Sequence, residues 1–149
     1  MATIIESLKS LFERDLKRLK KQVELYSDES ALWIVDKEIN NSAGNLCLHL
    51  FGNLQYFIGN VLGDSGYIRD REKEFSVKNI SRIDLLSKLQ TTQDVVKQTL
   101  SGLTEKDLEK IYPEQVLGYE MTTAFFLIHL NGHLNYHLGQ INYHRRLLG

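Results

Sequence analysis

Apolar residues recur at steps of three and four along most of this chain, and this spacing constrains the fold more than any other feature. Between residues 3 and 26 the series is Ile5, Leu8, Phe12, Leu16, Leu19, Val23 and Tyr26. Such steps place the side chains on one face of an α-helix. The chain also contains a single proline, so few positions would interrupt a helix. The pattern predicts an all-α protein.

Three further segments show the same spacing, at 42–61, at 81–100 and from 122 or 123 to about 148. Each begins at a residue suited to N-capping, namely Ser42, Ser81, and Thr122 or Thr123. A short turn is expected at 104–110. The polar stretch at 63–80 is longer than the 2–8 residues that usually join bundle helices. We therefore predict one domain, residues 1–149, folded as a four-helix bundle with a long crossover between its second and third helices.

Charge and cysteine content narrow the class of protein. The chain has 18 basic and 19 acidic residues and a net charge of -1, which argues against nucleic acid as a partner. No apolar run approaches the ~20 residues that span a bilayer, so no membrane association is expected. The single cysteine, Cys47, excludes an intramolecular disulfide, and the first ten residues do not have the pattern of a signal peptide. These features predict a cytoplasmic protein.

Four of the five histidines lie in the last segment, at positions 129, 133, 137 and 144. Residues four apart lie on one face of a helix, about 6 Å apart, and can bind one metal ion. His129 and His137 would be about 12 Å apart, which is too far for one ion. A metal-binding pair is therefore 129 with 133 or 133 with 137, and His133 belongs to both. We expect His129 to lie on the surface or to support a ligand, and His144 to face solvent.

The fifth histidine, His49, lies inside the apolar series of the second segment, where a leucine would be usual. A buried imidazole needs partners for its nitrogens, and a metal ion would be one such partner. His49 with two histidines of the last helix would form a three-histidine site with an open position, as in catalytic zinc sites. The alternative is a set of hydrogen-bonded core histidines without metal. Cys47 is rotated about 200° from His49 on a helix and is expected to serve in packing.

Two amides lie close to these histidines in sequence. Asn53 is one turn after His49, and Gln140 follows His137 by three residues. A metal-bound histidine usually donates its other N–H to an acceptor behind it. Asn53 and Gln140 are therefore candidates to orient ligands or substrate, the alternative being polar groups at the end of the bundle.

Three motifs of this sequence resemble a known family. They are "HLNYHLGQI" at 133–141, "HLFGN" at 49–53 and "GYIRDREKEF" at 66–75, the last with Glu72 where aspartate is expected. Together they resemble the DinB/YfiT-like superfamily of metal-dependent four-helix-bundle proteins, in a poorly characterised branch. The resemblance implies a divalent ion, zinc or nickel, bound by His49, His133 and His137. It also implies a homodimer, since homodimers are common in that superfamily.

Some members of that superfamily are thiol S-transferases that use a low-molecular-weight thiol such as bacillithiol, mycothiol or glutathione. Three neutral imidazoles would leave the full charge on the ion, which can lower the pKa of water or a thiol to about 7. Our first hypothesis is therefore an enzyme, a thiol S-transferase or hydrolase, that activates a small thiol or water for attack on a small electrophilic substrate.

The substrate pocket is expected between the second and fourth helices, opening under the crossover. Arg69 and Arg71 would bind an anionic substrate or thiol there. The alternative is that both are surface charges, paired with Asp70, Glu72 and Glu74.

Two other functions are compatible with the same residues. The histidines, with or without metal, could hold together a structural homodimer, and "AFFLIHL" at 124–130 is apolar on more than one face of its helix. A weaker hypothesis is a protein that binds a small molecule without converting it. A catalytic site keeps one coordination position open, whereas a structural site is closed.

Overall fold

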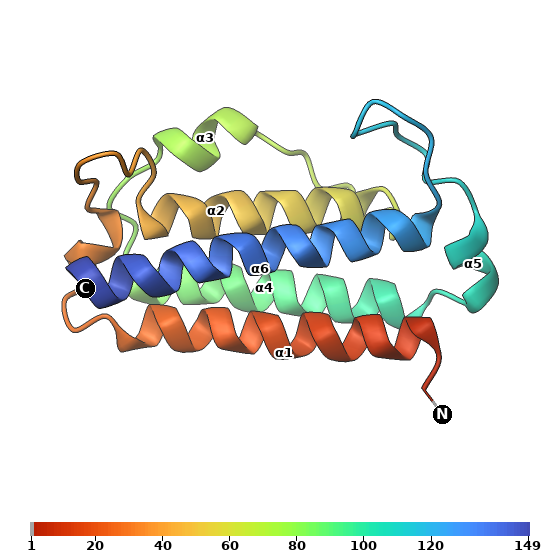
Figure 1. Ribbon diagram of the computed structural model, residues 1–149, viewed down its shortest axis with the longest axis horizontal. Coiled ribbons are helices and arrows are strands. Elements are labelled where there is room, and N and C mark those ends of the chain that lie inside the picture. Colours follow the sequence, from red (N-terminus) through yellow and green to blue (C-terminus); the bar gives the residue numbers. More distant parts are fainter. Residues whose placement is uncertain (1) are drawn as a thin grey trace.

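Four long helices run side by side in the computed structural model, which describes residues 2–149 (Figure 1). They are α1 (Ile4–Leu25), α2 (Ala43–Leu54), α4 (Arg82–Ser101) and α6 (Thr123–Leu148). Helix α1 packs against α4 and α6, and α2 packs against the same two helices. Their apolar faces therefore meet in one core.

Shorter elements complete the chain. They are a 3-10 helix (Glu29–Trp33), a π-helix that continues α2 (Gln55–Asn60), α3 (Arg71–Ser76) and α5 (Glu105–Glu109). Residues 2–149 contain no strand, and their extended pairing is confined to one isolated bridge between Ile111 and Thr122. The predicted all-α class is confirmed.

The helices begin at the capping residues that the sequence predicted. The side chains of Ser42, Ser81 and Thr122 each accept a hydrogen bond from the backbone N–H three residues later. These bonds satisfy N–H groups that have no partner inside the helix. Thr104 caps α5 in the same way, so the expected turn at 104–110 forms.

Leucine, isoleucine and phenylalanine side chains from all four long helices fill the core. The most deeply buried include Leu16, Leu19, Leu50, Leu54, Leu85, Leu89, Leu127 and Leu134. Cys47 is also fully buried, and burial raises the pKa of its thiol to about 12, as expected for a packing residue.

Within the described residues, none of the helices combines the length and the apolar composition needed to cross a membrane.

The crossover is more ordered than its polar sequence predicts. Its middle forms α3, which lies along the outside of α2 (Figure 1). The Asn45 side-chain amide, on α2, donates hydrogen bonds to the backbone carbonyls of Glu74 (3.0 Å) and Val77 (2.8 Å). These bonds hold the crossover against the part of α2 that carries His49.

The prediction that His144 faces solvent is wrong, because His144 is buried. The Tyr26 hydroxyl donates to its Nδ1 at 2.7 Å, and its Nε2 donates to the Ile34 carbonyl at 2.9 Å. The last turns of α6 pack against the end of α1 and the segment after the 3-10 helix. His144 therefore joins three parts of the chain and has no nitrogen left for a ligand.

Candidate metal centre

Three histidines from two helices converge on one point. Nε2 of His133 lies 3.2 Å from Nε2 of His49 and 3.2 Å from Nε2 of His137. One ring nitrogen from each histidine lies within 4.8 Å of the other two. Of the two pairings open at the sequence level, the structure brings 133 and 137 together with His49. His129 is exposed and stacks on the ring of Phe126.

Glu74 determines which nitrogen of His49 carries the proton. Its Oε1 lies 3.0 Å from Nδ1 of His49. A carboxylate only accepts hydrogen bonds, so Nδ1 of His49 carries the proton and donates a hydrogen bond to Glu74. In the neutral ring, Nε2 of His49 therefore presents a lone pair to the cluster.

Gln140 contacts Nδ1 of His137, as Glu74 contacts Nδ1 of His49. Its side-chain Oε1 lies 2.7 Å from Nδ1 of His137, so Nδ1 donates and Nε2 presents a lone pair. The sequence made Gln140 a candidate to orient ligands or substrate, and here its side chain contacts His137. The structure thus directs two imidazole lone pairs at the Nε2 of a third ring.

His133 is the central ring of the cluster. Burial lowers its pKa to about 4, and the neighbouring rings of His137, His49 and His129 contribute in the same direction. Burial also lowers the pKa of His137. His133 is therefore neutral near pH 7 and carries one proton. If this proton is on Nε2 of His133, it can form a hydrogen bond to the lone pair of either His49 or His137, but not to both. If it is on Nδ1, it can form a hydrogen bond to neither.

Two buried polar atoms near the cluster have no hydrogen-bond partner among the described residues. They are Nδ1 of His133 and Oδ1 of Asn53. Asn53 is buried on α2, one turn after His49. Unpaired buried polar atoms are rare and often mark a place where water, an ion or a ligand binds.

The donor set fits a divalent transition-metal ion. Three imidazole nitrogens suit zinc, nickel, copper or iron better than magnesium or calcium, which prefer oxygen ligands. Lone pairs that face one another repel, and a cation between them removes the repulsion. His49, His133 and His137 would hold the ion, while Glu74 and Gln140 hold two of the rings in the required tautomer.

The two arginines of the crossover are placed differently from each other. Arg69 is half-buried and binds Glu74 through two nitrogens, at 2.9 Å (Nε to Oε2) and 3.0 Å (Nη2 to Oε1). Arg71 is exposed, with its guanidinium 5.2 Å from the Phe75 ring centre. Burial raises the pKa of Glu74, but the hydrogen bonds from His49 and Arg69 outweigh it, so the net pKa is lowered. Glu74 is therefore an anion at neutral pH.

Sequence reasoning assigned Glu74 only as a surface partner of the arginines and missed its contact with His49. A signal was nevertheless present in Gly52, three residues after His49 and therefore on the same face of α2. A glycine inside a helix often marks the close approach of another group. Here that group is the Glu74 side chain, which occupies the space of the missing Cβ.

A surface groove of about 460 Å³ adjoins the cluster at His137 and Gln140. Its other lining residues are Glu38, Ile39, Asn40, Asn41, Leu46, Tyr136, Tyr143, His144 and Leu147. A pocket does lie beneath the crossover, beside Glu74, but no histidine lines it. Neither Arg69 nor Arg71 lines either pocket. The groove beside a cluster histidine is therefore formed by α6, the loop at 38–41 and Leu46, rather than by the crossover.

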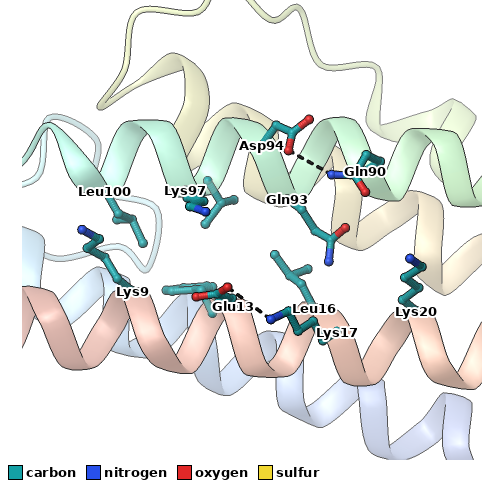
Figure 2. A pocket seen from close by; sticks show the side chains of 12 residues that line it. Lys9, Glu13, Leu16, Lys17, Lys20, Gln90, Gln93, Asp94, Lys97 and Leu100 are labelled. Atoms are coloured by element: carbon teal, nitrogen blue, oxygen red, sulfur yellow. Dashed lines mark hydrogen bonds and ion pairs between the residues drawn. The ribbon is translucent and has the colours of Figure 1, made fainter.

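Another pocket lies between α1 and α4, away from the histidines (Figure 2). Its rim carries Lys9, Lys17, Lys20 and Lys97, and its floor is formed by buried apolar side chains. Glu13 pairs with Lys17, and Asp94 accepts a hydrogen bond from Gln90. These are polar contacts along the solvated faces of two helices, and none of the predicted site residues is among them.

Fold and cluster together define an all-helical protein with a candidate three-histidine metal centre. The sequence matches the model of a family described as a protein of unknown function, DUF1572, over residues 2–149, and the chain belongs to this family. A search of curated proteins returns no match.

Proposed function

We propose that this chain is a DinB-like four-helix-bundle protein that binds a divalent ion, zinc or nickel, through His49, His133 and His137. One observation carries the proposal. Oxygens of Glu74 and Gln140 lie within hydrogen-bond distance of Nδ1 of His49 and His137, and the Nε2 atoms of both rings face Nε2 of His133. Without a cation this arrangement is unfavourable, and with one it is a ligand set.

The site supports an enzyme that acts on a small electrophilic molecule. A divalent ion bound there would supply a Lewis acid that lowers the pKa of a small thiol or water. His133 and His137 are half-buried rather than fully enclosed, which leaves part of each residue in contact with solvent. The groove beside His137 offers amides at Asn40 and Asn41 and a phenol at Tyr136 to bind the substrate. Thiol S-transfer and hydrolysis are the reaction classes to test first.

The test is the metal content of the purified protein, measured by inorganic mass spectrometry. We expect about one ion per chain in the wild type and its loss in His49→Ala and His133→Ala, because each removes one of three ligands. His129→Ala is the matched control, since His129 lies on the same helix outside the cluster. A wild type that takes up no zinc, nickel or manganese would refute the proposal.

An exposed apolar stripe on α6 supports a second candidate function, a homodimer held through this helix. The stripe consists of Phe125, Ile128, Gly132, Tyr136, Gly139, Tyr143 and Leu147. Its large side chains are about half exposed or more, and a Cβ added to either glycine would meet nothing within 4 Å. No charged residue occurs between 121 and 144. Exposed patches of this kind mark interaction surfaces.

The stripe extends equally far on both sides of Tyr136, so a second copy could pair with it antiparallel around a two-fold axis. We expect Ile128→Glu and Tyr143→Glu to shift the chain from dimer to monomer in size-exclusion chromatography with light scattering. Ile83→Glu, at an isoleucine on α4 that is even more exposed than Ile128, is the control. A wild type that is monomeric at high micromolar concentration would exclude this function.

A further inference from the structure

Glu74 lies where the crossover meets α2, and its carboxylate is held from two directions. Oε1 accepts hydrogen bonds from His49 Nδ1 and Arg69 Nη2, and Oε2 accepts one from Arg69 Nε. The residue is only 6% exposed. A buried carboxylate with an arginine donor on each oxygen and a histidine donor on Oε1 has one well-defined position.

Gly52 provides the space for this carboxylate. A Cβ added at position 52 would overlap Oε2 of Glu74 and lie 2.6 Å from its Cδ. Glycine in the middle of a helix is unfavourable, so its presence within α2 needs a reason. The reason in this structure is the Glu74 side chain, which passes over the helix at this position to reach His49.

The same short helix contacts His49 a second time. The Phe75 ring packs against the imidazole, with ring centres 4.9 Å apart. Adjacent residues of α3 therefore fix His49 by a hydrogen bond and by ring packing. Neither residue belongs to the histidine cluster itself.

We propose that Glu74 is a positioning residue for the metal centre, with Gly52 giving it space and Arg69 holding it in place. This inference rests on the proposed metal binding. Glu74 would keep His49 in the Nδ1–H tautomer, orient its ring and make its Nε2 a stronger donor. Carboxylates behind metal-bound histidines act in this way, and their loss typically weakens metal binding 10- to 100-fold.

The experiment is a double-mutant cycle on zinc affinity, measured by competition with a chelator. We expect Glu74→Ala and Gly52→Ala each to weaken binding roughly 10- to 100-fold. The double variant should bind no more weakly than Glu74→Ala alone, because the alanine at position 52 acts by displacing the Glu74 carboxylate. Glu72→Ala, an exposed glutamate on the same helix, should bind like the wild type.

The absorption spectrum of the cobalt-substituted protein adds a readout that general destabilisation would not change. The d–d bands should shift in Glu74→Ala and in Gly52→Ala, and Glu74→Gln, which keeps an acceptor oxygen for Nδ1, should restore part of the affinity. Circular dichroism of the metal-free variants checks that α2 is intact.

The outcomes separate this inference from the proposed function. Additive losses in the cycle, or a Glu74→Ala variant with wild-type affinity and spectrum, would overturn the positioning role while the metal site stands. A wild type without metal affinity would overturn both. Non-additive losses with shifted bands would support both.

Discussion

At the scale of single residues, Asp15 is a buried carboxylate outside the histidine cluster. It lies on α1 with a fully buried side chain. Arg14 donates to its Oδ1 at 2.8 Å, and the amides of Asn131 and Asn135, on α6, donate to its Oδ2. Burial raises the pKa of Asp15, but these hydrogen bonds outweigh it and hold the net pKa below the ordinary value. Asp15 thus joins α1 to α6 as an anion.

We expect Asp15→Asn to lower the free energy of unfolding at pH 7 by about 3 kcal/mol, because it leaves buried donors poorly paired. Since the pKa of Asp15 is lower when folded, its contribution is complete above the ordinary value of 3.8 and is lost as pH falls below it. The difference between variant and wild type should therefore shrink on acidification. Urea unfolding at pH 7 and at acid pH measures it.

Asp94→Asn, at an exposed aspartate on α4, is the control for that comparison and should change stability by less than about 0.5 kcal/mol. If Asp15→Asn were as stable as the wild type at pH 7, the interhelical hydrogen bonds would contribute nothing and the assignment would be wrong.

At the scale of elements, α3 is too short to be stable by itself and depends on its attachment to α2. Asn45 provides two of the bonds that hold it, to the carbonyls of Glu74 and Val77. The same helix carries the Glu74 and Phe75 side chains to His49. Docking of α3 on α2 therefore also brings the Glu74 and Phe75 side chains against His49 of the histidine cluster.

We predict that Asn45→Ala loosens α3 by about 2 kcal/mol, since two hydrogen bonds, one buried and one partly buried, are lost at ~1 kcal/mol each. Amide hydrogen exchange over residues 71–78 should accelerate roughly tenfold or more, while exchange in α5, at the far end of the molecule, stays unchanged (Figure 1). Unchanged exchange over 71–78 would show that other contacts hold the crossover.

At the scale of the whole molecule, the histidine cluster joins α2 to α6 across 84 residues of sequence. An ion that binds only the folded chain stabilises it according to its concentration, by about 2.7 kcal/mol at a hundred times its dissociation constant. For a domain of this size that corresponds to a Tm increase of roughly 5–10 °C.

We therefore expect zinc to raise the Tm of the wild type by that amount and a chelator to reverse it, as followed by differential scanning calorimetry. His133→Ala should show no zinc-dependent shift, whereas His129→Ala should respond like the wild type. An equal shift in His133→Ala would place zinc at some other site on the molecule.

The sequence by itself determined the helical class, the starts of the long helices and a set of candidate site histidines. Steps of three and four define a helical face regardless of what packs on it, and Ser and Thr caps act locally. Helix geometry also shows that either histidine pair of the last helix, 129 with 133 or 133 with 137, could share an ion with His49. It could not choose between the pairs, because that depends on how α6 is rotated against α2.

Only the tertiary structure decided the rest, because it depends on contacts between segments distant in sequence. His144 is buried since Tyr26 and Ile34 lie beside it, although its own surroundings in sequence look like an exposed helix end. Glu74 contacts His49 of the histidine cluster because α3 docks on α2 at Gly52, which no periodic pattern predicts. Periodicity reports the face of one helix, whereas a site built from two helices and a crossover requires their relative placement.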